Sequence, residues 1–174
     1  PVISQAVGVP MYAHVARHAR RKTNPPNDSW VAFSQDPRGY KKWPTFMVGL
    51  WQTHVYVQFG VIYESAQKAV LGQAVQTLDL AQLREKLPVG TRVYGDYMVP
   101  GGNSLAALSD EQLRALAQRV QEVKKADLLF GVEWPRETVL AMSPNAFEAN
   151  LIERCRQLAV LYPLAMGKEG ATLS

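Results

Sequence analysis

The sequence has only one cysteine, Cys155, among its 174 residues. A single cysteine cannot form a disulfide within the chain, so a reducing compartment is predicted. It stands in a helical pattern beside Leu151, Ile152 and Leu158, which favours a half-buried apolar role over a nucleophilic one.

Long apolar runs are absent as well. No run approaches the roughly 18 residues of a membrane-spanning helix. The N-terminus also lacks the charged and then apolar segments of a signal peptide. We therefore predict a cytoplasmic location and no membrane partner.

Several motifs of nucleotide and metal chemistry are missing. The chain has no phosphate loop ending in Gly-Lys-Ser/Thr, no Gly-x-Gly-x-x-Gly, no Gly-x-Ser-x-Gly and no pair of cysteines. These absences disfavour NTPases, Rossmann enzymes, serine hydrolases and zinc ribbons. No cofactor is predicted.

A metal site is not predicted either. His14 and His18 are four residues apart, a spacing that places two zinc ligands on one face of a helix. The glutamate of the zinc-protease motif is missing between them, and Arg17 and Arg21 would repel a dication. His54 is the only other histidine, so no third ligand is evident beyond it.

What the chain does have is a basic first quarter. Residues 1–42 contain seven of the nineteen Lys and Arg residues and two of the fifteen acids. The other 132 residues carry twelve cations and thirteen acids, so the net charge of +4 originates in the N-terminal segment. Cations mixed with aromatic side chains are typical of a surface that binds anions.

These cations are the candidate anion-binding residues. They are Arg17, Arg20, Arg21, Arg38, Lys41 and Lys42. Tyr40 and Trp43 adjoin the last of them, where a ring can stack on a base while a cation holds a phosphate. Three other interpretations stay open: a solvated basic face, salt bridges to distant acids in the fold, and rings that cover the edge of the sheet.

Length and composition favour one domain. With 47% hydrophobic residues, the chain is able to bury a single core. We predict a single α+β domain over residues 1–174, with a mixed, mostly antiparallel sheet and helices packed mainly on one face. The chain opens on Pro1 rather than methionine, which favours a truncated N-terminus.

Periodicity and turn residues predict the order of elements. Helices are expected over residues 10–22, over 65–86 as one or two, and after Ser109 and Ser143. Strands are expected over residues 30–34, 46–51, 53–64, 91–98 and 126–134. The helix after Ser109 opens with a capping box completed by Gln112, and its stripe of Leu113, Leu116 and Val120 is expected to face the sheet.

Two of these strands carry polar stripes. His54, Tyr56 and Gln58 share one face of the first strand, opposite Val55, Val57 and Phe59, and Arg92, Tyr94 and Asp96 share one face of the second. In one sheet the stripes would line a pocket, with His54 as acid or base and Tyr56, Arg92 and Asp96 beside it. The alternative is a solvated outer face.

Three blocks of the sequence resemble the YktB-like proteins of Gram-positive bacteria. They read HVARHARRKTNPPNDSWVAF, RGYKKWPTFMVGLWQTHVYV and LSDEQLRALAQRVQEVKKADLLFGVEW, and the similarity extends from about His14 to Pro163. The resemblance implies one cytoplasmic α/β domain with a mixed sheet and flanking helices. It implies no activity and no catalytic residues. Members usually have a few dozen more residues, largely helical, before the stretch that matches His14.

The sequence leaves three classes of function open. The first is a binding module for a phosphorylated small molecule or nucleic acid, which uses the basic and aromatic cluster. The second is a small-molecule enzyme centred on His54. The third is a protein-interaction domain, which would show a large apolar patch. The charge distribution favours the first.

Overall fold

The computed structural model describes residues 2–17 and 26–173. Within them lies a seven-stranded open sheet of order β1-β2-β3-β4-β7-β5-β6, with antiparallel pairing throughout. Its strands are β1 (Tyr12–Val15), β2 (Asp28–Ser34), β3 (Thr45–Trp51), β4 (His54–Val61), β5 (Arg92–Tyr94), β6 (Asn103–Ser104) and β7 (Leu128–Pro135). The predicted α+β class and its largely antiparallel sheet are confirmed.

Helices lie at both ends of the chain and between β4 and β7. They are α1 (Val2–Val7), α2 (Lys68–Thr77), α3 (Leu80–Lys86), α4 (Asp110–Glu122), α5 (Arg136–Ala141), α6 (Pro144–Leu158), the 3-10 turn η1 (Ala159–Leu161) and α7 (Tyr162–Ala165). In the part of the chain that is described, none of these helices is long and apolar enough to cross a membrane.

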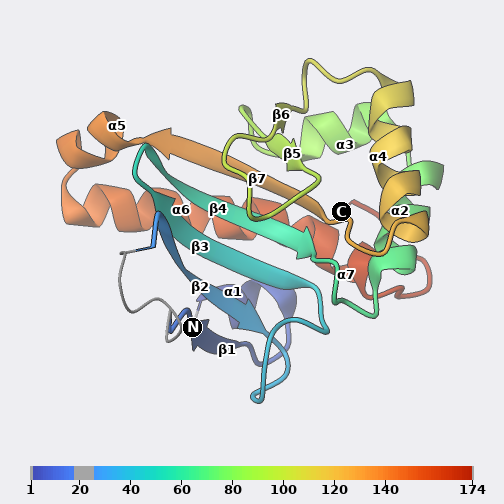
Figure 1. Cartoon of the computed structure of the whole chain (residues 1–174), viewed down its shortest axis with the longest axis horizontal. Coiled ribbons are helices and arrows are strands. Elements are labelled where there is room, and N and C mark those ends of the chain that lie inside the picture. The colour runs from blue at the N-terminus through green and yellow to red at the C-terminus, as the bar shows by residue number, and fades with distance from the viewer. Residues whose placement is uncertain (1, 18–25, 174) are drawn as a thin grey trace.

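Alternation along the strands gives the sheet two different faces. Phe46, Val57, Phe59 and Phe130 point to one face and are fully buried in the main core. Helix α6 runs behind the sheet on this side and contacts β4 and β7 (Figure 1). We call this side the helix face. Its apolar row on β4 is the one that the sequence predicts.

The opposite side carries the polar and aromatic row of β4, and we call it the loop face. Cross-strand pairing places Trp30 of β2, Tyr56 of β4 and Glu133 of β7 on it. The loop after β5 passes in front of this face (Figure 1), and its Tyr97 packs edge-on against Trp30. A second, smaller cluster of buried side chains lies here.

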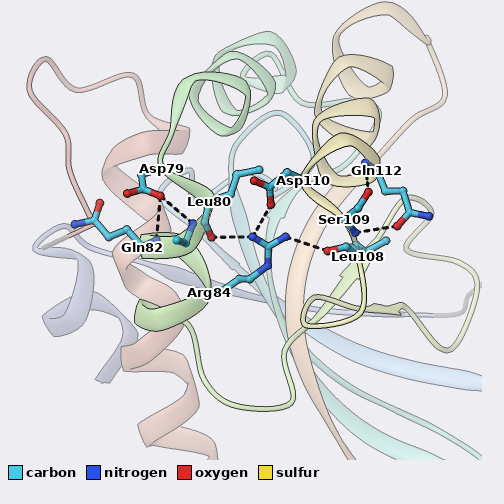
Figure 2. Close-up of polar contacts among 9 residues, drawn as sticks. Asp79, Leu80, Gln82, Arg84, Leu108, Ser109, Asp110 and Gln112 are labelled. Atoms are coloured by element: carbon cyan, nitrogen blue, oxygen red, sulfur yellow. Dashed lines mark hydrogen bonds and ion pairs between the residues drawn. The ribbon is translucent and has the colours of Figure 1, made fainter.

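Polar contacts fasten the helices beside β5. Figure 2 shows the Arg84 guanidinium of α3 donating to the carbonyl oxygens of Leu80 and Leu108 and pairing with Asp110 at 2.7 Å. The capping box predicted at Ser109 and Gln112 is present and opens α4. These contacts satisfy backbone groups that helix ends and loops leave without partners.

The prediction of a helix over residues 10–22 is wrong for the part of that range that the structure describes. Tyr12 to Val15 form β1, which pairs with β2 in the register Tyr12↔Ser34 to Val15↔Val31. The apolar residues of this segment are too few to stabilise a helix by packing. Cross-strand hydrogen bonds to β2 therefore determine its conformation. His18 and the later residues of the predicted helix lie outside the described residues.

Other boundaries also differ from expectation. The strand predicted over 91–98 is three residues long, from Arg92 to Tyr94. The final helix ends at Leu158 and continues as η1 and α7. Short helices α1 and α5 have too few turns for a periodic pattern to reveal them.

Helix α4 packs chiefly against α2 rather than against the sheet. Leu113, Ala117 and Val120 of α4 are buried, whereas Leu116 is only half-buried. The contact is close because α2 has a glycine at the crossing. A Cβ at Gly72 would lie 2.6 Å from the Ala117 carbonyl oxygen.

We predict that Gly72→Ala lowers the free energy of unfolding by about 1–3 kcal/mol, because the added methyl overpacks this contact. The same change in an exposed helix would stabilise it by roughly 0.5–1 kcal/mol. Urea titration followed by circular dichroism measures the change. Gln73→Ala, at the neighbouring exposed position of α2, serves as the control and should stay within about 0.5 kcal/mol of the parent. Equal or higher stability of Gly72→Ala would contradict the close packing.

Candidate functional site

An open hollow of about 1050 Å³ gathers all four of the described candidate cations. We call it the basic hollow. Its charged and aromatic lining comprises His14, Arg17, Asp36, Arg38, Tyr40, Lys41, Lys42 and Glu64. These residues come from β1 and the residues just after it, from the β2–β3 connection and from the segment after β4, so the fold brings together positions that are distant in the sequence. Arg20 and Arg21, also predicted for this site, lie outside the described residues.

The wall of the basic hollow is the turn that follows β2. The Asp36 carboxylate accepts from the backbone N–H of Arg38 at 2.9 Å and from its guanidinium at 3.4 Å. The Ser34 hydroxyl donates to the Gly39 carbonyl at 3.0 Å. The backbone N–H of Arg38, followed by the charge of its side chain, lowers the pKa of Asp36. The turn is therefore a defined structure with an acid at its base.

His14 attaches this turn to the sheet. A ring nitrogen of His14 makes a 2.9 Å hydrogen bond with the Asp36 carbonyl oxygen. The ring also lies 6.0 Å from the Tyr40 ring, tilted by 42°. The imidazole thus has a local structural partner on the loop face.

Lys41 faces an acid across the hollow. Its ammonium nitrogen lies 2.8 Å from the Glu64 carboxylate, which raises the pKa of Lys41 and lowers that of Glu64, the mutual hydrogen bond being the main cause of both shifts. Both side chains are partly exposed, so the pair stabilises the fold weakly. Arg38 and Lys41 are therefore the two cations of the hollow that already have acidic partners.

Arg17 and Lys42 differ from these two. Both are exposed, and neither side chain forms an ion pair with another described residue. The backbone of Lys42 is nevertheless fixed, because its carbonyl oxygen accepts from the Ala66 N–H at 3.1 Å. The hollow thus holds two cations without an acidic partner in the described chain, and one of them, Lys42, has its backbone hydrogen-bonded to the segment after β4.

The two predicted stacking residues separate into different environments. Tyr40 lines the basic hollow and packs against the smaller core of the loop face. Trp43 is half-buried and lines a neighbouring hollow instead. The backbone N–H of Trp43 donates to the Tyr40 carbonyl at 3.2 Å, so one tight turn sends the two rings to different sides.

The polar stripes converge on a residue that the sequence reasoning missed, Glu133 of β7. Its carboxylate accepts from the Tyr94 hydroxyl at 2.7 Å and lies 3.3 Å from Arg92 Nε and 3.7 Å from His54 Nε2. Glu133 can receive all three because β7 lies between β4 and β5. The only signal in the sequence was one acid in an otherwise apolar strand.

This Glu133 cluster is mostly closed. The His54 and Glu133 side chains are 11% and 15% exposed, and Tyr94 is 3% exposed. Burial, and next the hydrogen bond to Glu133, raises the pKa of Tyr94 far above its usual range. The cluster therefore holds a neutral phenol that donates to a carboxylate, which is a stable structural arrangement.

Two predicted members of the polar pocket are not bonded to Glu133. Asp96 follows the end of β5 and accepts from the backbone N–H of Met98 at 2.9 Å in an exposed turn, so its predicted place on the strand is wrong. The Tyr56 ring extends over Gly49, where an added Cβ would lie 2.5 Å from the phenol oxygen. Burial raises the pKa of Tyr56 strongly. Neither side chain forms a hydrogen bond or ion pair with the Glu133 carboxylate, although Tyr56 lies directly across from Glu133 in the sheet.

The described residues form neither a metal-binding site nor a reactive thiol site. No group of three or more His, Cys, Asp or Glu side chains in residues 2–17 and 26–173 is arranged to hold a metal ion. Cys155 is buried in α6, and burial raises the pKa of its thiol to about 11. A thiol with that pKa is a poor nucleophile at neutral pH, in agreement with the apolar role predicted from the sequence.

We predict that Tyr94→Phe lowers the free energy of unfolding by about 1–3 kcal/mol, because Glu133 loses its shortest hydrogen bond in a closed environment. Thermal and urea unfolding measure the effect. The matched control is Tyr63→Phe, because Tyr63 is 38% exposed, and it should stay within about 0.5 kcal/mol of the parent. An unchanged stability for Tyr94→Phe would mean that water replaces the phenol at no cost.

Taken together, these features define an α+β protein with one antiparallel sheet, a helix-covered face, and a loop face bordered by a basic hollow. The chain belongs to the family described as Domain of unknown function (DUF1054), whose profile matches residues 1–162. The resemblance to YktB-like proteins is consistent with this family.

Its relatives come from Gram-positive bacteria. A UPF0637 protein of Bacillus velezensis is 42% identical over 165 residues, which cover 94% of this chain and 78% of the relative. A UPF0637 protein of Bacillus licheniformis is 41% identical over 164 residues, or 94% of this chain and 77% of the relative. One from Lysinibacillus sphaericus is 36% identical over 166 residues, or 95% and 78%. These names state no activity.

Proposed function

We propose that this protein binds a phosphate-bearing ligand in the basic hollow. The observation that carries the proposal is the presence of Arg17 and Lys42, without acidic partners among the described residues, in the same hollow as Arg38 and Lys41. Phosphate groups are the anions that such clusters of Arg and Lys hold well. A cytoplasmic location, predicted from the cysteine content, belongs to the same proposal.

The charges inside the hollow favour a phosphate over an anion that carries a single negative charge. Asp36 and Glu64 offset Arg38 and Lys41, which leaves the charge of Arg17 and Lys42 for a ligand. A phosphate ester carries about −1.5 to −2 charges at pH 7. It can therefore match these two cations and then compete with Glu64 for Lys41.

The enzyme hypothesis centred on His54 has less support. The Glu133 carboxylate already accepts from the Tyr94 hydroxyl and lies beside Arg92 and His54, and apart from the 40% exposed Arg92 these side chains are largely enclosed. Asp96 is absent from the group. A general acid or base must reach a substrate atom, whereas the Glu133 carboxylate is already engaged by groups of the fold itself.

We predict that Lys42→Ala weakens binding of single-stranded RNA or DNA and reduces the slope of log affinity against log salt by roughly 0.7, because one phosphate contact is lost. Fluorescence anisotropy over a series of salt concentrations measures both. Lys86→Ala, which removes the same charge from an exposed position at the end of α3, is the control and should leave the slope unchanged. If the parent protein binds neither single-stranded nucleic acid nor inorganic tripolyphosphate at low ionic strength, the proposed function is wrong.

We also predict that Glu64→Gln strengthens phosphate binding by about 0.2–1 kcal/mol, because Lys41 is released from an exposed ion pair. The measurement is the same titration. Glu85→Gln changes the net charge equally at an exposed position of α3 and controls for long-range attraction. Equal gains in the two variants would show that Lys41 does not take part.

A further inference from the structure

A second hollow, of about 440 Å³, lies against the basic hollow. We call it the aromatic hollow. It is lined by Val9, Pro10, Tyr12, Gln35, Asp36, Pro37, Arg38 and Trp43. Apart from the turn residues, its lining is apolar or aromatic, with one amide.

The two hollows share a wall. Asp36, Pro37 and Arg38 line both of them. This is the turn held by the Asp36 carboxylate and the Ser34 hydroxyl, and the Arg38 side chain on it is 90% exposed. A ligand that crosses this ridge would therefore meet cations on one side, a guanidinium at the crest and aromatic rings on the other side.

We propose that the phosphate-bearing ligand is a nucleotide unit, whose phosphate lies in the basic hollow and whose base lies in the aromatic hollow. This inference rests on the proposed function and adds the class of ligand. Base rings stack on Tyr and Trp side chains, and a guanidinium between them can contact either the phosphate or the ring. Tyr12 is 43% exposed and available for such a contact.

Gln35 adds a polar group suited to a base. Its side-chain oxygen accepts from the Tyr162 hydroxyl at 2.8 Å. That bond fixes the amide from the direction of the core and leaves its N–H groups for an acceptor, because no other described residue is bonded to them. Base edges present such acceptors as ring nitrogens and carbonyl oxygens. An aliphatic or purely anionic ligand would leave this amide unused.

A free nucleotide and a single-stranded nucleic acid supply the same chemistry. The test uses fluorescent oligothymidylate, an abasic oligonucleotide of the same length and charge, and competition by ATP or by inorganic tripolyphosphate. We expect oligothymidylate to bind roughly 5- to 150-fold more tightly than the abasic strand, which is the usual range for one stacked base. ATP should compete better than tripolyphosphate. If ATP matches oligothymidylate in affinity, the source is a free nucleotide, and if it binds far more weakly, the source is a strand.

Substitutions in the aromatic hollow test whether the preference for oligothymidylate over the abasic strand arises there. Tyr12→Ala and Trp43→Ala should each reduce the ratio between oligothymidylate and abasic strand and leave abasic binding unchanged, whereas Tyr12→Phe should keep the ratio. Because Trp43 is half-buried, Tyr12→Ala decides the matter if Trp43→Ala unfolds.

The outcomes separate the two claims. Equal binding of both strands, with a salt dependence that Lys42→Ala reduces, would overturn the nucleotide inference and keep the phosphate function. A base preference that survives Tyr12→Ala and Trp43→Ala would also overturn it. Absence of binding to either strand and to tripolyphosphate would overturn both.

Discussion

The rest of the structure depends on the alternation of side chains along β4. One row of this central strand, including Val57 and Phe59, is fully buried against the helices, so the other row must face the opposite side. That row carries His54, Tyr56 and Gln58, which cannot be covered by an apolar helix without large cost. Loops with aromatic and hydrogen-bonding residues cover it instead. The division into a helix face and a loop face thus follows from one strand and its register.

The loop face shows two ways of placing charge at the same sheet. At Glu133, neighbouring strands bring a phenol, a guanidinium and an imidazole to one carboxylate, and all of these groups except the guanidinium of Arg92 are largely enclosed. In the basic hollow, the cations come from loops and remain exposed. Glycines let the polar row of β4 lie close to the neighbouring strands, because Gln58 and Tyr56 lie over Gly131 and Gly49, where any side chain would collide. Strand positions therefore form the fixed network, and loops form the accessible one.

Much of the fold is predictable from local patterns, and much of the site is not. Alternating strands and the capping box at Ser109 have strong short-range signals, and they appear where expected. Strand β1 is not predictable in this way, because its four mostly exposed residues at a sheet edge show no clear alternation of apolar and polar side chains. The contacts of Glu133 and the pairing of Lys41 with Glu64 depend on which strands become neighbours. No spacing in the sequence contains that information.

The difference in exposure decides which group of charges is suited to a ligand. An exposed pair such as Lys41 and Glu64 contributes roughly 0–1 kcal/mol, so an anion of higher charge can displace the carboxylate. Removing a partner from the enclosed Glu133 network would instead leave a buried group unsatisfied, at about 1–3 kcal/mol or more. The binding free energy of a ligand at Glu133 would first have to offset that cost. In the basic hollow, Arg17 and Lys42 have no acidic partner within residues 2–17 and 26–173, so they can meet an anion before any of the ion pairs described there is broken.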